Sequence, residues 1–247
     1  MLGRSLRVHP SLRFVGTLLA GSVMVGALLS GCSSDPTPTS STFTTLPRTG
    51  AVRIRVLGDT PGAGAAIIAA TSSDDATDLS VSASSLGAWM DLPREDGDGA
   101  VHDRLVQITW DAPDLVVASL GGDALVIPDD RLMACAKASS APTDRAQFIA
   151  CAAPLLDARL VNQRVMAIAF DVLAHTRDAK LVLVGHAGAD PTSPLAPWQQ
   201  AALAELLDAR IAAATIAVGE SGATWAERVV FCAPTDCVAA VRSRGWI

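Results

Sequence analysis

Two uninterrupted apolar runs constrain the fold of this chain most strongly. Residues 114–120 read DLVVASL and residues 180–184 read KLVLV, with no polar residue at alternate positions. A strand that has one face in water alternates apolar and polar residues, whereas strands of a parallel sheet are covered on both faces and need not alternate. The two runs therefore predict central strands of a parallel sheet.

Helical and extended segments alternate along the rest of the chain. Their order predicts an α/β fold, a flavodoxin-like three-layer arrangement with helices on both faces of a parallel sheet. In such sheets ligands bind beyond the carboxyl ends of the strands, so the residues directly after each strand are the informative ones. The further strands are expected at 52–57, 79–82 and 228–231, and the helices at 62–71, 102–110, 144–178 and 197–215.

The first 31 residues are typical of an export signal. Residues 1–13 contain three arginines and no acid, and residues 14–31 form an apolar run. The run ends in Leu29-Ser30-Gly31-Cys32, which resembles a bacterial lipobox and implies cleavage before Cys32 and lipidation of its thiol. We expect a protein anchored by lipid to the extracytoplasmic face of the cell membrane. An ordinary cleaved signal and an uncleaved anchor are the alternatives.

The segment 32–50 is predicted to be the lipidated cysteine and a solvated tether, because thirteen of the residues 33–50 are Ser, Thr or Pro. Residues 51–247 then form the folded domain. The whole chain has a formal net charge of −6, and removal of the three leader arginines leaves 16 basic against 25 acidic residues, a net of −9. This charge argues against a nucleic-acid partner and against binding to anionic lipid headgroups. We expect a monomer.

Four cysteines remain after the lipobox, an even number that indicates disulfides in an exported protein. Three pairings exist, and we favour Cys135–Cys151 and Cys232–Cys237 because the members of each pair are close in sequence. A zinc site is the alternative, but no C-x-x-C spacing is present. No metal or other cofactor is expected.

Short glycine-containing motifs follow the predicted strands in order. They are Gly58-Asp59-Thr60, a segment containing Gly87, Gly121-Gly122-Asp123 and Gly185-His186. With Cys135 after the third motif and Trp246-Ile247 at the end, this order resembles the SGNH (GDSL-type) esterases and lipases, in particular secreted actinobacterial members. The resemblance covers about residues 52–247 and implies carboxylic-ester hydrolysis.

The resemblance assigns a role to three positions. Thr60 stands where the family has its nucleophilic serine, Gly87 where it has an oxyanion-hole glycine, and Asp123 where it has an asparagine donor. The extra methyl group of Thr60 crowds the attack, and a carboxylate at Asp123 repels a developing oxyanion unless it is protonated. The structural alternative for Thr60 is a turn residue. These changes predict impaired hydrolysis.

The family's D-x-x-H motif, which supplies the catalytic base, is absent from the chain. We expect its counterpart after Trp246-Ile247, so a truncated gene product is one alternative. His186 is the candidate substitute base because it directly follows a strand, with a lining or capping role as the alternative. His175 is expected to be solvated, and His102 to begin a helix.

Other catalytic motifs are absent or incomplete in the sequence. No G-x-S-x-G elbow is present, and Gly62-Ala63-Gly64 lacks the third glycine of a dinucleotide loop because Ile67 stands there. The acidic cluster Glu95-Asp96-Gly97-Asp98 is expected to be a solvated loop, with Ca²⁺ binding as the alternative.

The sequence thus predicts a weak or inactive SGNH-like hydrolase that acts as a binding or accessory protein of the cell envelope. Its ligand would be an acyl ester or a glycan or lipid of the envelope. The alternative is an active carboxylic-ester hydrolase or acyltransferase with an atypical site centred on Thr60.

Overall fold

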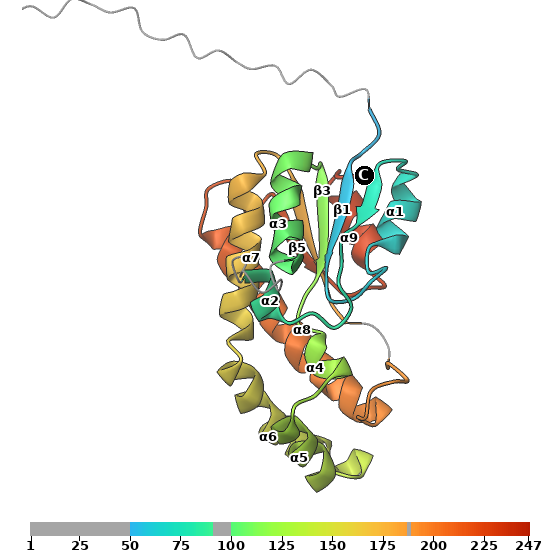
Figure 1. The fold of residues 1–247 in the computed structure, drawn as a ribbon, viewed down its shortest axis with the longest axis vertical. Helices are drawn as coiled ribbons and strands as arrows, with labels where there is room; N and C mark the ends of the chain where they lie inside the picture. The colour runs from blue at the N-terminus through green and yellow to red at the C-terminus, as the bar shows by residue number, and fades with distance from the viewer. Residues whose placement is uncertain (1–49, 91–99, 187–188) are drawn as a thin grey trace, which may run out of the picture. The chain divides into compact units, whose positions relative to one another are not determined.

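The computed structural model describes residues 50–90, 100–186 and 189–247 (Figure 1). The predicted signal 1–31, the lipidation site Cys32, the tether up to residue 49 and the acidic cluster 95–98 lie outside the described residues. Within the described part, no helix has the length and hydropathy needed to cross a membrane.

The core of the fold is a five-stranded sheet in which every pairing is parallel. The strand order β2-β1-β3-β4-β5 is the flavodoxin-like order, so the predicted α/β fold with a parallel sheet is confirmed. The strands are β1 (Ile54–Gly58), β2 (Ala76–Asp78), β3 (Leu115–Ser119), β4 (Lys180–Val184) and β5 (Val229–Cys232).

The second strand lies three residues earlier than the predicted span 79–82. β2 is an edge strand of half-buried and exposed residues, so no apolar run marks it in the sequence. Leu79 and Val81, inside the predicted span, still donate backbone hydrogen bonds to Val56 and Gly58 of β1. The predicted segment 79–82 therefore still runs beside β1, but β2 itself ends at Asp78.

Helices cover both faces of the sheet (Figure 1). One face packs against α1 and α9 around a small apolar cluster, and the other packs against α2, α3, α7 and α8 around a larger one. The helices are α1 (Ala65–Thr71), α2 (Leu86–Met90), α3 (Ala100–Asp111), α4 (Asp123–Val126), α5 (Asp130–Ala138), α6 (Arg145–Ala158), α7 (Val161–His175), α8 (Pro197–Glu220) and α9 (Cys237–Ser243), with a 3₁₀ turn at Pro142–Asp144.

The predicted helical stretch 144–178 is two helices, α6 and α7. The break is at Leu160, whose backbone is left-handed with φ of 55°. Such a backbone conformation cannot continue a right-handed helix, and an apolar repeat alone does not reveal it. The turn lets α6 leave the sheet and pack with α5 against the first half of α8 (Figure 1).

Two disulfides tie these elements together, and both predicted pairings are confirmed. Cys135–Cys151 joins α5 to α6, and Cys232–Cys237 joins the end of β5 to the start of α9. The first therefore holds the α5–α6 pair together, and the second closes the loop that follows β5 at the carboxyl edge of the sheet.

Candidate functional site

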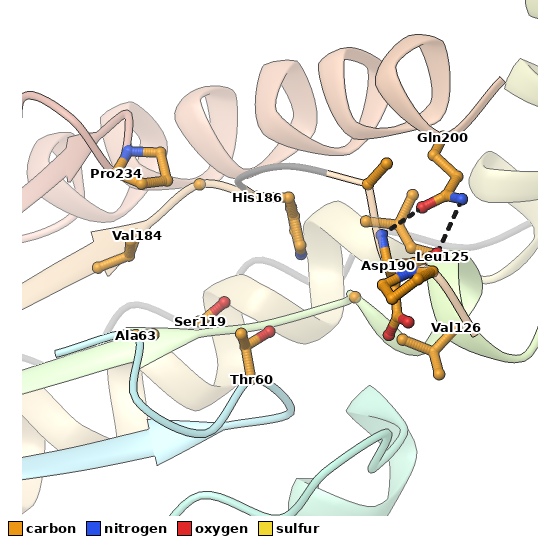
Figure 2. A pocket seen from close by; sticks show the side chains of 14 residues that line it. Thr60, Ala63, Ser119, Leu125, Val126, Val184, His186, Asp190, Gln200 and Pro234 are labelled. Atoms are coloured by element: carbon orange, nitrogen blue, oxygen red, sulfur yellow. Dashed lines mark hydrogen bonds between the residues drawn. The ribbon is translucent and has the colours of Figure 1, made fainter. Parts of the chain in front are cut away.

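The carboxyl ends of β1, β3, β4 and β5 enclose a cavity of about 350 Å³, here called the main pocket (Figure 2). Because the strands are parallel, the segments that follow them meet at this edge. The lining residues are Thr60, Ala63, Ser119, Gly122, Leu125, Val126, Val184, Gly185, His186, Ala189, Asp190, Pro191, Gln200 and Pro234.

Asp59 joins the segments that follow β1 and β3. Its side chain is buried, and Oδ2 accepts a hydrogen bond from the backbone N–H of Gly122 at 2.6 Å. Oδ1 accepts a second from the hydroxyl of Thr60 at 3.0 Å. The Thr60 hydroxyl, on the wall of the main pocket, is therefore hydrogen-bonded to a carboxylate.

Burial raises the pKa of the Asp59 carboxyl to about 6, because the ionised form is poorly solvated there. The charge of His186 and the hydrogen bonds from Gly122 and Thr60 oppose this shift. Asp59 therefore changes its protonation state close to neutral pH, beside the pocket.

His186 is held by Asp208, which reaches it from α8. Nδ1 of the imidazole lies 2.8 Å from Oδ1 of Asp208, and the backbone N–H of His186 donates to the same carboxylate at 3.1 Å. Gly185 permits this approach, because a Cβ there would lie 2.6 Å from Oδ2 of Asp208. An ionised carboxylate only accepts hydrogen bonds, so Nδ1 carries a hydrogen and Nε2 of the neutral ring is an acceptor.

The other ring nitrogen of His186 has no hydrogen-bond partner among the described residues, although the side chain is only 4% exposed. Figure 2 shows the ring extending into the main pocket from the end of β4. On its inner side the ring lies against Gly122, where an added Cβ would be 3.2 Å from Nε2 and 3.0 Å from Oδ1 of Asp59. An imidazole oriented by a carboxylate with a free Nε2 can accept or donate a proton.

Gly87 and Asp123 are not among the residues that line the main pocket, although the charge of Asp123 still acts on Asp59. Asp123 lines an adjacent pocket of about 180 Å³, where its Oδ2 lies 3.7 Å from a guanidinium nitrogen of Arg159. Burial raises the pKa of the Asp123 carboxyl, and the charge of Arg159 opposes the shift. A Cβ added to Gly87 in α2 would meet Arg164, which lines the same adjacent pocket. Of the four predicted site residues, only Thr60 and His186 line the main pocket.

The other two histidines of the domain are elsewhere. His175 ends α7 with a side chain that is 57% exposed, and Nδ1 lies 3.0 Å from Asp171 one turn earlier. His102 is in α3, as predicted, and its side chain is outside the described residues. The chain thus offers an exposed histidine–aspartate pair as a reference for the buried one.

Three residues of the site were not found from the sequence. Asp208 belongs to a helix whose apolar repeat predicts burial, and nothing local indicates that it meets His186. Asp190 and Gln200 lie at the far end of the main pocket, where Gln200 Oε1 accepts from the backbone N–H of Asp190 at 2.7 Å (Figure 2). Asp190 lies in the segment that follows β4, which could have drawn attention to it, whereas Gln200 lies in α8 and has no comparable signal.

No family model and no curated protein matches the chain. Among solved structures it is similar to an extracellular lipase from Streptomyces rimosus, at 14% identity and a TM-score of 0.46, over 78% of this chain and 100% of that one. It is also similar to phospholipase A1 from Streptomyces albidoflavus, at 17% identity and a TM-score of 0.45, over 79% of this chain and 85% of that one. Both similarities are too distant to assign a role to any residue.

Burial of Asp59 gives a testable dependence of stability on pH. In the range between the unfolded pKa of 3.8 and the folded pKa of about 6, the folded state keeps a proton that the unfolded state loses. Stability from this group therefore falls as pH rises, by up to about 3 kcal/mol for a shift of roughly two units. Asp59→Asn lacks this titration. Its free energy of unfolding should therefore rise relative to that of the natural protein as the pH increases from about 4 to about 7.

Denaturant unfolding at about pH 4 and about pH 7 measures the difference in unfolding free energy between Asp59→Asn and the natural protein. Asp74→Asn, at an exposed position, is the matched control. A difference between Asp59→Asn and the natural protein that stays constant over this range would show that Asp59 titrates as a solvated carboxyl.

Proposed function

We propose that this chain is a lipid-anchored protein of the extracytoplasmic membrane face, with an SGNH-like domain that binds a small ligand in the main pocket and hydrolyses esters weakly or not at all. The predicted lipobox supports the anchor, and the motifs that follow the strands support the SGNH-like domain. The ligand class is an acyl ester or a component of the envelope.

The hydrogen bond from Thr60 to Asp59 carries this proposal. A hydroxyl nucleophile is activated when an adjacent base accepts its proton. Here the acceptor is a buried carboxylate that also binds Gly122, and it joins two segments of the fold. This bond gives Thr60 a structural role and directs its hydroxyl hydrogen to Asp59 and not to the imidazole of His186.

The oxyanion donors support the same reading. Hydrolysis requires donors that converge on the oxygen of the tetrahedral intermediate, and loss of one costs roughly 2.7–4 kcal/mol of barrier. The carboxylate of Asp123 lies near Arg159 in the adjacent pocket and donates nothing to the main pocket when it is ionised. Ligand binding therefore fits the main pocket better than efficient hydrolysis.

Turnover of a short ester tests the proposal. The purified protein and its Thr60→Ala variant should hydrolyse p-nitrophenyl butyrate at the same background rate, since Thr60 supplies no activated oxygen. Thr60→Ser removes the crowding methyl group but keeps the bond to Asp59, so it should not raise the rate. Thr143→Ala, an exposed threonine far along the chain, is the matched control. Turnover that disappears only in Thr60→Ala would overturn the proposal.

A second candidate function, ester hydrolysis with Thr60 as nucleophile and His186 as base, is favoured by the contact between His186 and Asp208. That contact orients the imidazole as a catalytic base is oriented, with one ring nitrogen on a carboxylate and the other free. Rotation of the Thr60 side chain away from Asp59 would be needed before the hydroxyl could be deprotonated by His186.

A fluorophosphonate probe separates the two candidates, because it labels activated hydroxyl nucleophiles covalently. We expect no labelling of the natural protein at high probe concentration. The hydrolase candidate instead requires labelling that is lost in Thr60→Ala and reduced by about 10⁴-fold in Asp208→Asn, where the imidazole is no longer held in its tautomer. His175→Gln is the matched control, since it alters the exposed pair only.

A further inference from the structure

The charges around the main pocket are unbalanced. Asp190 lies on its wall, Asp208 contacts Nδ1 of His186, and Asp59 lies near Gly122 on the other side of the same imidazole. No lysine or arginine is among the residues that line it in the described part of the chain. The hydroxyl and the backbone N–H of Thr192 donate to Asp190 and hold the pKa of its carboxyl below its ordinary value. A negatively charged ligand would meet repulsion from these carboxylates, with no lysine or arginine among the described lining residues to offset it.

Several N–H donors of the pocket wall are already used within the protein. The backbone N–H of Gly122 donates to Asp59, that of His186 to Asp208, and that of Asp190 to Gln200. The side-chain amide of Gln200 donates to the carbonyl oxygens of Asp190 and Leu195. The wall therefore offers a ligand few N–H groups.

Acceptors remain available. Nε2 of His186 has no partner in the described part of the chain, and its side chain is more than nine-tenths buried at the pocket wall. In the described part of the chain the bonds from Thr192 use Oδ1 of Asp190, so Oδ2 of this partly exposed carboxylate is a second acceptor. A buried polar atom costs free energy when it stays unpaired, so a ligand that donates a hydrogen bond to Nε2 of His186 is favoured. Apolar side chains line both ends of the pocket, with Val184 and Pro234 at one end and Leu125 and Val126 beside Asp190 at the other (Figure 2).

We propose that the main pocket binds a ring-shaped ligand that donates hydrogen bonds and has no negative charge, a neutral or amino pyranose, and that it rejects anionic sugars. This inference rests on the proposed binding function and specifies its ligand class. Hydroxyl or ammonium groups of the ring donate to His186 and Asp190, and its C–H groups pack on the apolar side chains that line the pocket. An acidic sugar of the same size would place a carboxylate beside Asp190.

The test uses three sugars of matched shape and different charge, namely glucosamine, glucose and glucuronate, added to the full protein at about pH 7. Binding is followed through the NMR signals of the His186 imidazole. Glucosamine and glucose should shift these signals, and glucuronate should bind at least about tenfold more weakly. Asp190→Asn should raise the affinity for glucuronate towards the affinity for glucose. His175→Gln should leave the affinities for all three sugars unchanged.

Glucuronate affinity equal to or above that of glucose would overturn the inference, as would an absence of any shift with all three sugars at about 50 mM. The ester assay is independent of this result. Turnover that depends on Thr60 would contradict the proposed function but would not change the expected order of the sugar affinities. Failure of the proposed function and failure of the sugar inference are therefore distinguishable.

Discussion

The hydrogen bond from the backbone N–H of Gly122 to the carboxylate of Asp59 organises the carboxyl edge of this fold. It joins the segment after β1 to the segment after β3, two neighbouring strands at the point where the strand order reverses. Ligand sites of open parallel sheets lie at this point. The bond places Thr60 on the pocket wall and brings Gly122 against the imidazole of His186, so the rest of the site depends on it.

Joining two loops through a buried carboxylate costs free energy, since burial disfavours the ionised form of the carboxyl group. The site contains a second carboxylate, Asp208, on the outer side of the same imidazole. One imidazole therefore lies close to two acids, and its charge lowers the pKa of Asp59 against the effect of burial. This electrostatic arrangement suits the recognition of neutral or cationic groups better than that of anions.

The architecture was predictable because its signals are local. Apolar runs at 114–120 and 180–184 predicted buried parallel strands, and short sequence separation predicted both disulfides. The edge strand β2 was misplaced because exposed strands carry no apolar run, and the break at Leu160 was missed because backbone handedness is not visible in an apolar repeat.

The site was predictable only in part. His186 was found because it directly follows a strand, whereas its partner Asp208 is 22 positions further on, in a helix, and meets it only through the fold. Asp123 also lies after a strand, but its side chain lines the adjacent pocket, and Gly87 lies against Arg164 at the border of that pocket. Their catalytic roles stay predictions.

The tautomer of His186 tests this account most directly. ¹⁵N NMR of the imidazole distinguishes a ring nitrogen that carries a hydrogen from one that does not. We predict a hydrogen on Nδ1 and none on Nε2, with Asp208→Asn shifting this balance and Asp171→Asn, beside the exposed His175, leaving it unchanged. A hydrogen on Nε2 in the natural protein would contradict the account, because the pocket would then present a donor where we place an acceptor.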